Sequence, residues 1–223
     1  MQAQAEILAY HGWGYNADFW SPLQKLLSPV ARLKAADRGY FGKAVQPRFE
    51  TTGLKIIFAH SLGLHLIPEH LIQQADTMVL MAAFEHFIPA NQQQAEVMKR
   101  LLKRMNDKML TKAHEVVHDF RERAEHASPS EFNIENLNPQ LLKADLKQLE
   151  ESRINLKELP QSLVIFIEGE NDLIHKSPHR QIQPSDRIKY YYVPAAGHAF
   201  PLTHAEECFS IIKLAIPILG HHE

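Results

Sequence analysis

Residues 54–63 read Leu54-Lys55-Ile56-Ile57-Phe58-Ala59-His60-Ser61-Leu62-Gly63, an apolar run that leads into a small-x-Ser-x-Gly turn and a helix-length segment. This order of strand, sharp turn and helix is typical of a nucleophile elbow, in which a strained turn presents a serine hydroxyl. The helix crowds the strand, so the residues two before and two after the serine must be small. Ala59 and Gly63 meet that need. The alternative is an ordinary helix start with a serine near its cap.

Six short runs have the composition of β-strands, and most are apolar along their length. They are Ala5–Tyr10, Ala31–Ala36, Leu54–Ala59, Thr77–Ala82, Leu163–Glu168 and Ile188–Val193. Strands buried on both faces show this pattern, so it predicts a mostly parallel sheet covered by helices. Helix-length segments such as Phe19–Leu27 and Leu62–Gln74 separate several of the runs. The sequence therefore predicts an α/β fold with about six strands flanked by helices.

One stretch breaks the alternation of strands and helices. From about Phe87 to Asn155 no run reads as a strand, and apolar residues recur at steps of three and four, which defines one helix face. The residues of that face are Met98, Leu101, Leu102, Met105, Met109, Ala113, Val116, Val117 and Phe120. A second helix is predicted over Pro139–Glu151, with Asn138 as its cap. We therefore predict a core formed by residues 1–86 and 156–223, with residues 87–155 inserted as a helical cap.

A loop after the first predicted strand can face the elbow. It reads His11-Gly12-Trp13-Gly14. Its backbone can turn toward Ser61, so that the N–H groups of Trp13 and Leu62 form an oxyanion hole. The alternative is a glycine-bracketed turn with Trp13 packed in the core.

Two polar residues follow the last two predicted strands. Asp172 comes just after the fifth run, and His198 just after the sixth. Because the carboxyl ends of parallel strands lie on one edge of a sheet, we expect Ser61, Asp172 and His198 to converge there. His198 would take the proton of Ser61, while Asp172 would hold the imidazole in the right tautomer. Glu170 is the alternative acid and His204 the alternative base.

Together these elements resemble the α/β-hydrolase superfamily, and within it the carboxylesterases of biotin synthesis that demethylate pimeloyl-[acyl-carrier protein] methyl ester. The resemblance covers nearly the whole chain. It rests on residues 11–20, the elbow, and the segments Asp37–Gly42, Gly169–Asp172 and Gly197–Phe200. It implies an α/β-hydrolase fold, an oxyanion hole formed by Trp13 and Leu62, and a cap that covers the acyl chain.

Aromatic residues near these motifs are candidates for the lining of an acyl pocket. They are Trp13, Phe84, Phe87 and Phe200. Apolar and aromatic side chains dominate the walls of small-molecule pockets. Packing in the core is the alternative role for each of them.

A basic stripe is predicted on the cap. Arg100, Arg104, Lys108 and Lys112 repeat every four residues, so they share one side of the predicted helix. Because acyl-carrier proteins are acidic, docking of such a carrier at this stripe would be electrostatically favoured. A solvated helix face is the alternative interpretation.

One motif points to a different chemistry. His114-Glu115-Val116-Val117-His118 matches the H-E-x-x-H pattern of zinc proteases on a predicted helix. No clear third ligand follows at the spacing that such sites require. We therefore predict no metal site and interpret these residues as part of the cap surface.

Composition limits the remaining possibilities. A chain of 223 residues with 45% apolar content can bury one core, and its net charge of −2 is spread along the chain, so neither nucleic acid nor a membrane is expected as a partner. The single cysteine, Cys208, cannot form an internal disulfide, and the first residues lack the pattern of a secretory signal. No apolar run approaches the ~20 residues needed to cross a bilayer. These features predict a cytoplasmic protein.

The sequence thus predicts a serine carboxylesterase that cleaves a small acyl ester through an acyl-enzyme, without a cofactor. A thioesterase or another small-molecule hydrolase would use the same residues. The alternative from a different class is a noncatalytic binding protein on the same scaffold.

Overall fold

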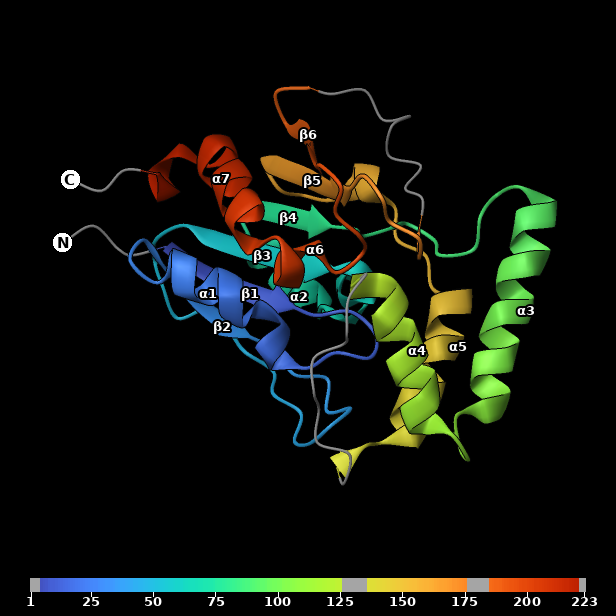
Figure 1. Ribbon diagram of the computed structural model, residues 1–223. Coiled ribbons are helices and arrows are strands. Elements are labelled where there is room, and N and C mark those ends of the chain that lie inside the picture. Colours follow the sequence, from blue (N-terminus) through green and yellow to red (C-terminus); the bar gives the residue numbers. More distant parts are fainter. Residues whose placement is uncertain (1–4, 126–135, 176–184, 221–223) are drawn as a thin grey trace.

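The computed structural model describes residues 5–125, 136–175 and 185–220. At its centre is a parallel sheet of six strands in the order β2-β1-β3-β4-β5-β6 (Figure 1). The strands are β1 (Ala5–Tyr10), β2 (Ala31–Ala35), β3 (Lys55–His60), β4 (Thr77–Met81), β5 (Leu163–Gly169) and β6 (Ile188–Val193). The predicted α/β fold with about six strands is confirmed.

The four inner strands β1, β3, β4 and β5 are buried on both faces, as their apolar composition predicts, whereas the edge strands β2 and β6 are partly exposed. Side chains alternate along each strand, so Ile7 and Ile56 join one apolar layer while their neighbours Leu8 and Ile57 join the other. Helices α1 (Ser21–Leu27), α6 (Phe200–Thr203) and α7 (Ala205–Ala215) cover the first face, and α2 (Glu69–Gln74) covers the second (Figure 1). Complete burial of each such aliphatic side chain contributes about 1.5–3 kcal/mol, and these two layers drive folding of the core.

The order of the strands creates a switch point beside β1. After β1 the chain moves outward to β2, and it then returns to the other side of β1 as β3. The loops that leave β1 and β3 therefore diverge at adjacent strand ends, where open α/β sheets bind their ligands. The first of these loops carries Trp13, and the second begins with Ser61.

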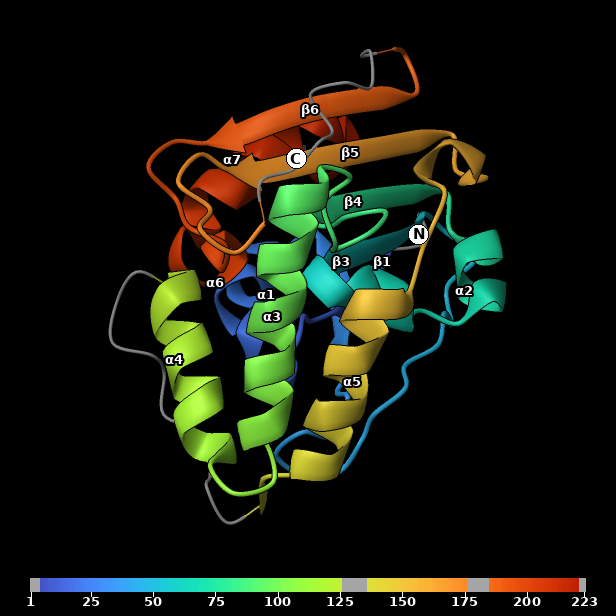
Figure 2. The ribbon, with the colours of Figure 1, turned by 90° about the vertical axis from the view of Figure 1, so that its right-hand side faces the viewer.

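Helices α3 (Gln92–Lys108), α4 (Ala113–Glu125) and α5 (Pro139–Glu151) form the cap. They follow β4 in the sequence and lie beyond the carboxyl edge of the sheet, as the two perpendicular views show (Figure 1, Figure 2). All three fall within residues 87–155, of which 126–135 lie outside the described residues. Their buried apolar side chains pack in one cluster with Trp13 and Leu62. The cap thus lies directly over the ends of β1 and β3.

The prediction of one continuous helix face from Met98 to Phe120 was wrong. The structure divides this segment into α3 and α4, with a turn over residues 109–112 in which Met109 is fully buried. A continuous helix of this length would span about 35 Å. Two shorter helices that fold back on each other can both turn their apolar sides toward the sheet, and tertiary packing therefore decides the break.

The predicted helix-length segment Leu62–Gln74 is also divided. A short 3-10 helix, η2 (Ser61–Leu66), precedes α2, and Ile67 between them is extended, with ψ of 127°. Pro68 disfavours helical geometry at the residue before it, which explains this break. The prediction for α5 is confirmed, since the Asn138 side chain accepts a hydrogen bond from the Leu141 N–H at 3.1 Å.

Within the described ranges, no helix has the length and apolar character needed to cross a membrane.

Candidate active site

The turn after β3 holds Ser61 in a strained conformation. Its φ is 54°, in the left-handed region that residues with a side chain rarely adopt. The η2 segment that follows is pressed against the end of β1: a Cβ on Gly63 would lie 2.3 Å from the carbonyl oxygen of Tyr10. Ala59, two residues before the serine, is fully buried. The geometry expected of a nucleophile elbow is therefore present at Ser61.

A continuous chain of hydrogen bonds runs from Ser61 through His198 to Asp172. The Nε2 atom of His198 lies 2.9 Å from the Oγ atom of Ser61, and its Nδ1 atom lies 2.7 Å from the Oδ2 atom of Asp172. A carboxylate can only accept, so Nδ1 carries the proton and Nε2 is free to accept the hydroxyl proton of Ser61. All three side chains are nearly or fully buried. We refer to these three residues as the relay.

The Asp172 carboxylate is held by its own loop. Its Oδ1 atom accepts the backbone N–H groups of Ile174 at 2.7 Å and His175 at 3.0 Å. Burial raises the pKa of this carboxyl, but His198 and the two N–H donors lower it more, so its pKa lies below the ordinary value. Asp172 is therefore a carboxylate at neutral pH, and it orients the imidazole.

Trp13 follows Gly12 in a loop that packs against Ser61, and Leu62 directly follows the serine in the chain. Gly12 lets the Trp13 loop approach closely, because a Cβ at Gly12 would lie 2.9 Å from the Ser61 Cβ atom. Leu62 is near the start of η2, where the N–H groups have no carbonyl partner within the helix. The Trp13 loop and the start of η2 therefore both lie next to Ser61.

The alternative acid and base have other contacts. Glu170 accepts the backbone N–H of Ala195 at 3.2 Å and is exposed, and the His204 ring lies 2.8 Å from the hydroxyl of Thr203. The structure brings Asp172 and His198, rather than these two residues, to Ser61.

An apolar cavity of about 430 Å³ lies between the core and the cap. Its walls include Trp13, Phe87, Met98, Leu101, Leu102, Met105, Val116, Phe120, Leu146, Leu149, Leu173 and Ile174. Phe120 connects it to the relay, since its ring centroid is 5.0 Å from that of Trp13 and 6.5 Å from that of His198. The cavity can hold an aliphatic or aromatic chain, although Ser61, Asp172 and His198 are not among its lining residues.

The four residues predicted to line an acyl pocket have different positions. Trp13 and Phe87 line the cavity. Phe84 is fully buried, with its ring against His65 and His175, and Phe200 is fully buried in the layer under α7. Neither of these two lines the cavity.

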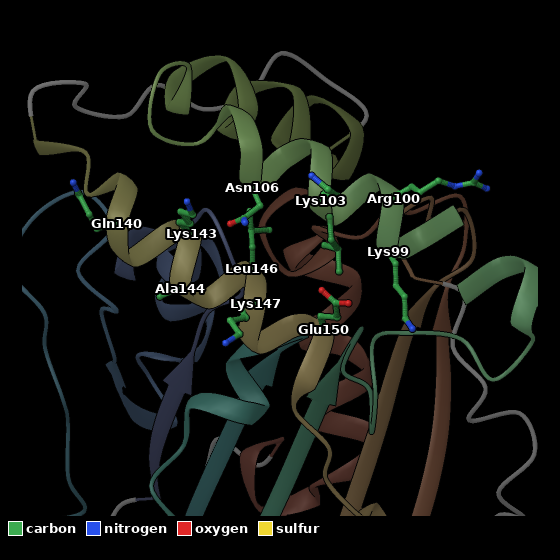
Figure 3. Close-up of a pocket in the computed structure, with 11 residues that line it drawn as sticks. Lys99, Arg100, Lys103, Asn106, Gln140, Lys143, Ala144, Leu146, Lys147 and Glu150 are labelled. Carbon is green, nitrogen blue, oxygen red and sulfur yellow. The ribbon is translucent and has the colours of Figure 1, made fainter. Parts of the chain in front are cut away.

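The predicted basic stripe spans α3 and the turn that follows it. Arg100 lines a groove of about 550 Å³ between α3 and α5, together with Lys99, Lys103, Lys143 and Lys147 (Figure 3). Arg104 and Lys108 line the cavity between the core and the cap, and Lys112 follows the end of α3 and pairs with Glu115 at 2.8 Å. Arg100, Arg104 and Lys108 thus share α3, and Lys112 lies in the turn between α3 and α4.

The H-E-x-x-H residues lie on α4. Glu115 is exposed and paired with Lys112, and this pairing lowers the pKa of its carboxyl. In the part of the chain that the structure describes, the group of possible metal ligands within reach of one another is His118, Asp119 and Glu122, all exposed. Glu115 and His114 do not belong to that group.

Polar contacts that the sequence motifs do not predict tie the cap to the core. Asp145 on α5 is 1% exposed and accepts Nε and Nη2 of Arg38, both at 2.8 Å, and the hydroxyl of Tyr40 at 2.6 Å. The indole Nε1 of Trp13 donates to the carbonyl of Leu142 at 2.9 Å. In the sequence, the signal that could have indicated these contacts was Asp145, an acidic residue on the otherwise apolar side of a predicted helix.

His60, directly before Ser61, is also buried against the relay. Its Nε2 atom lies 3.0 Å from the carbonyl oxygen of His198. A histidine at the end of an apolar predicted strand was the signal that could have identified it.

No protein-family model and no curated protein sequence matches this chain. Solved structures do match it. A bromoperoxidase from Bacillus anthracis is 14% identical over 97% of this chain and 92% of its own, with a TM-score of 0.75. An esterase from Exiguobacterium antarcticum (11% identity, 99% and 94% coverage, TM-score 0.74) and a thermophilic esterase from Thermogutta terrifontis (14%, 99% and 92%, 0.71) are similar too. The chain therefore has the α/β-hydrolase fold.

Proposed function

We propose that this protein is a serine hydrolase that cleaves carboxylic esters, with Ser61 as its nucleophile. One observation carries the proposal: the Oγ atom of Ser61 lies 2.9 Å from the Nε2 atom of His198, whose Nδ1 atom is held by Asp172 at 2.7 Å. This arrangement activates a hydroxyl. The esterases among the similar structures agree with the proposal.

In the first half of the reaction, His198 Nε2 takes the proton of Ser61 as Oγ attacks the ester carbonyl carbon. The carbonyl oxygen becomes an oxyanion, which accepts the N–H groups of Trp13 and Leu62. Removal of one such donor typically costs about 3 kcal/mol of transition-state stabilisation. His198 then gives its proton to the leaving alkoxide, and an alcohol departs from the acyl-enzyme.

In the second half, His198 takes a proton from water, and the resulting hydroxide attacks the acyl-enzyme. The proton then passes to Ser61 as its bond to the acyl carbon breaks, and the acid is released. Asp172 stays ionised throughout and stabilises the imidazolium that forms in each half.

The substrate that we propose has an apolar acyl chain. The cavity between the core and the cap is lined mainly by aliphatic and aromatic side chains, which favour such a chain. The resemblance to the carboxylesterases of biotin synthesis leads us to propose pimeloyl-[acyl-carrier protein] methyl ester as the specific substrate. We also propose a cytoplasmic location, in agreement with Cys208, the single cysteine of the chain, which is buried and free.

A fluorophosphonate probe tests the hydrolase proposal. We expect the wild-type protein to carry the adduct on Ser61, and Ser61→Ala to lose both the adduct and the hydrolysis of a p-nitrophenyl ester panel. Ser210→Ala is the matched control, because this serine on α7 is exposed and its hydroxyl donates to the Glu206 carbonyl of its own helix. An unlabelled wild-type protein that is folded would overturn the proposal.

An acidic carrier protein is the partner that we propose for the cap. The groove between α3 and α5 is lined by five cations and one acid, Glu150 (Figure 3). Lys103 and Lys147 have carboxylate partners on their own helices, at 2.7 Å and 3.5 Å, whereas for Lys99, Arg100 and Lys143 the described residues provide no ion pair. Complementary charge of this kind speeds association and favours an acidic partner.

Charge reversal tests carrier docking. The triple variant Arg100→Glu, Lys103→Glu and Lys143→Glu leaves the walls of the apolar cavity unchanged. We expect kcat/KM for the carrier-bound methyl ester to fall about tenfold or more, and kcat/KM for free short-chain esters to stay the same. Lys25→Glu, on α1 away from the cap, is the control. Equal losses on both substrates would exclude docking at this groove.

A further inference from the structure

His60 occupies a buried position where three parts of the candidate site meet. It ends β3 and precedes Ser61, and it is 0% exposed. Its ring stacks on Phe19 with centroids 4.5 Å apart and lies 4.9 Å from the ring of His198. A Cβ at Gly12 would lie 2.9 Å from its Nδ1 atom, so the ring also touches the loop that leads to Trp13. One side chain thus contacts the segments that carry the nucleophile, the base and an oxyanion donor.

The hydrogen bond of His60 defines its chemical state. Its Nε2 atom lies 3.0 Å from the main-chain oxygen of His198, and a carbonyl can only accept, so Nε2 carries a proton. Among the described residues, Nδ1 has no hydrogen-bond partner. The titratable groups that face the ring are His198, Asp172, His11 and Tyr15. Burial and the neighbouring His198 hold the pKa of His60 well below its ordinary value, so the ring is neutral.

We propose that His60 is a positioning residue: its Nε2–H donates to the His198 carbonyl and holds the loop of the base at the correct distance from Ser61. This inference rests on the proposed hydrolase function, because the distance that it controls is that between Ser61 and His198. The bond joins residues 138 positions apart in the sequence. The loop between β6 and α6, which carries His198, is thereby fixed to the strand that ends at the nucleophile.

The expected consequence is kinetic. A displacement of about 1 Å in a reacting group can cost about 100-fold in rate. Loss of one of the contacts that hold the loop should displace His198 by less, so we expect kcat to fall about tenfold while KM stays near the wild-type value. Substrate binding depends on the cavity walls, which His60 does not line.

Two substitutions at this position separate the hydrogen bond from the packing. His60→Phe keeps a planar ring against Phe19 but removes the donor. His60→Gln places an amide N–H near the position of Nε2 and should restore most of kcat. The matched control is His65→Phe: its Nε2 donates to the Phe84 carbonyl at 2.9 Å and its ring packs on Phe84, and neither of these contacts involves the relay. We expect His65→Phe to keep the wild-type kcat.

The rate of fluorophosphonate labelling and kcat and KM on a p-nitrophenyl ester are the readouts, with thermal unfolding to show that each variant is folded. A tenfold slower labelling of His60→Phe, recovery in His60→Gln and no change in His65→Phe would support the proposal. Wild-type labelling of a folded His60→Phe would overturn it while the hydrolase function stands. Absence of labelling in the wild-type protein would instead refute the hydrolase function itself.

A direct observation of the tautomer completes the test. Nitrogen-15 NMR of the histidine rings should show His60 with a protonated Nε2 and an unprotonated Nδ1 between pH 6 and 8. A protonated Nδ1 with a bare Nε2 would exclude donation to the His198 carbonyl, and with it the proposal.

Discussion

Replacement of Gly63 by alanine should disturb stability and catalysis together. The added Cβ would lie 2.3 Å from the Tyr10 carbonyl oxygen and 2.8 Å from that of His11, whereas ordinary contacts begin near 3.4 Å. Both atoms belong to the backbone, so no side-chain rotation can relieve the clash. The η2 segment and the end of β1 must separate by about 1 Å.

That separation has two measurable effects. Overpacking of this kind typically costs about 1–3 kcal/mol, so the free energy of unfolding in urea should fall by that amount. Leu62 moves with η2 while Trp13 follows β1, so the two proposed oxyanion donors are pulled apart. A misplacement of about 1 Å in a reacting site costs about 100-fold, and kcat/KM on a p-nitrophenyl ester should fall by about that factor.

Gly42→Ala provides the matched control. No atom lies within 4 Å of a Cβ built at Gly42, so the stability of this variant should stay within about 0.5 kcal/mol of wild type, and its activity should not change. Wild-type activity in Gly63→Ala would refute the reasoning, because it would show that the spacing between η2 and β1 does not determine the position of the donors.

Three further predictions concern the cap, the core and the cavity. Asp145→Ala leaves Arg38 without its carboxylate, and the free energy of unfolding should fall by about 3 kcal/mol. This value is at the lower end for a broken buried pair, because the Arg38 guanidinium is 37% exposed and can be hydrated. Lys147→Ala, in an exposed pair of the same helix, should change the free energy of unfolding by less than about 1 kcal/mol. Urea titrations of both variants test this, and equal effects would contradict it. The pKa of His60 is lower in the folded state than in the unfolded state, so its contribution to stability is present above about pH 6.5 and is lost as the pH falls below that value. Urea titrations between pH 7 and pH 5 should therefore show a smaller loss of stability for His60→Gln than for wild type, and parallel curves would argue against a neutral buried ring. Met105→Trp should fill part of the 430 Å³ cavity and reduce kcat/KM for long-chain p-nitrophenyl esters about tenfold, while kcat/KM for p-nitrophenyl acetate stays the same. A uniform loss of kcat/KM across chain lengths would show that the acyl chain lies elsewhere.

The strands of the sheet and their positions along the chain could be predicted from the sequence. Apolar runs separated by helix-length segments are local patterns, and each predicted boundary lies within one residue of the observed one. Ser61, Asp172 and His198 could be grouped because each follows a predicted strand, and the carboxyl ends of parallel strands share an edge. The structure places the three side chains in hydrogen-bond contact. Their catalytic roles stay predictions.

The extent of the cap helices depended on contacts that local pattern does not contain. The apolar periodicity continues through Met109, but the chain turns there because both α3 and α4 pack against the core. Arg100, Arg104 and Lys108 of the predicted basic stripe all lie on α3, whereas the cationic groove also includes Lys143 and Lys147 of α5, which belong to a different helix. A charge pattern along one helix could not indicate what faces it across a groove.

The sequence by itself determined the fold class, the strands and the residues at their carboxyl ends, because period, residue size and turn chemistry act within a few positions of the chain. Tertiary structure alone decided the partners of the buried polar groups. Asp145 meets Arg38 and Tyr40 over more than 100 residues, and His60 meets the His198 carbonyl over 138. Burial removes water as a partner, so each of these groups must find a protein partner, and only the packed arrangement of distant segments specifies which one.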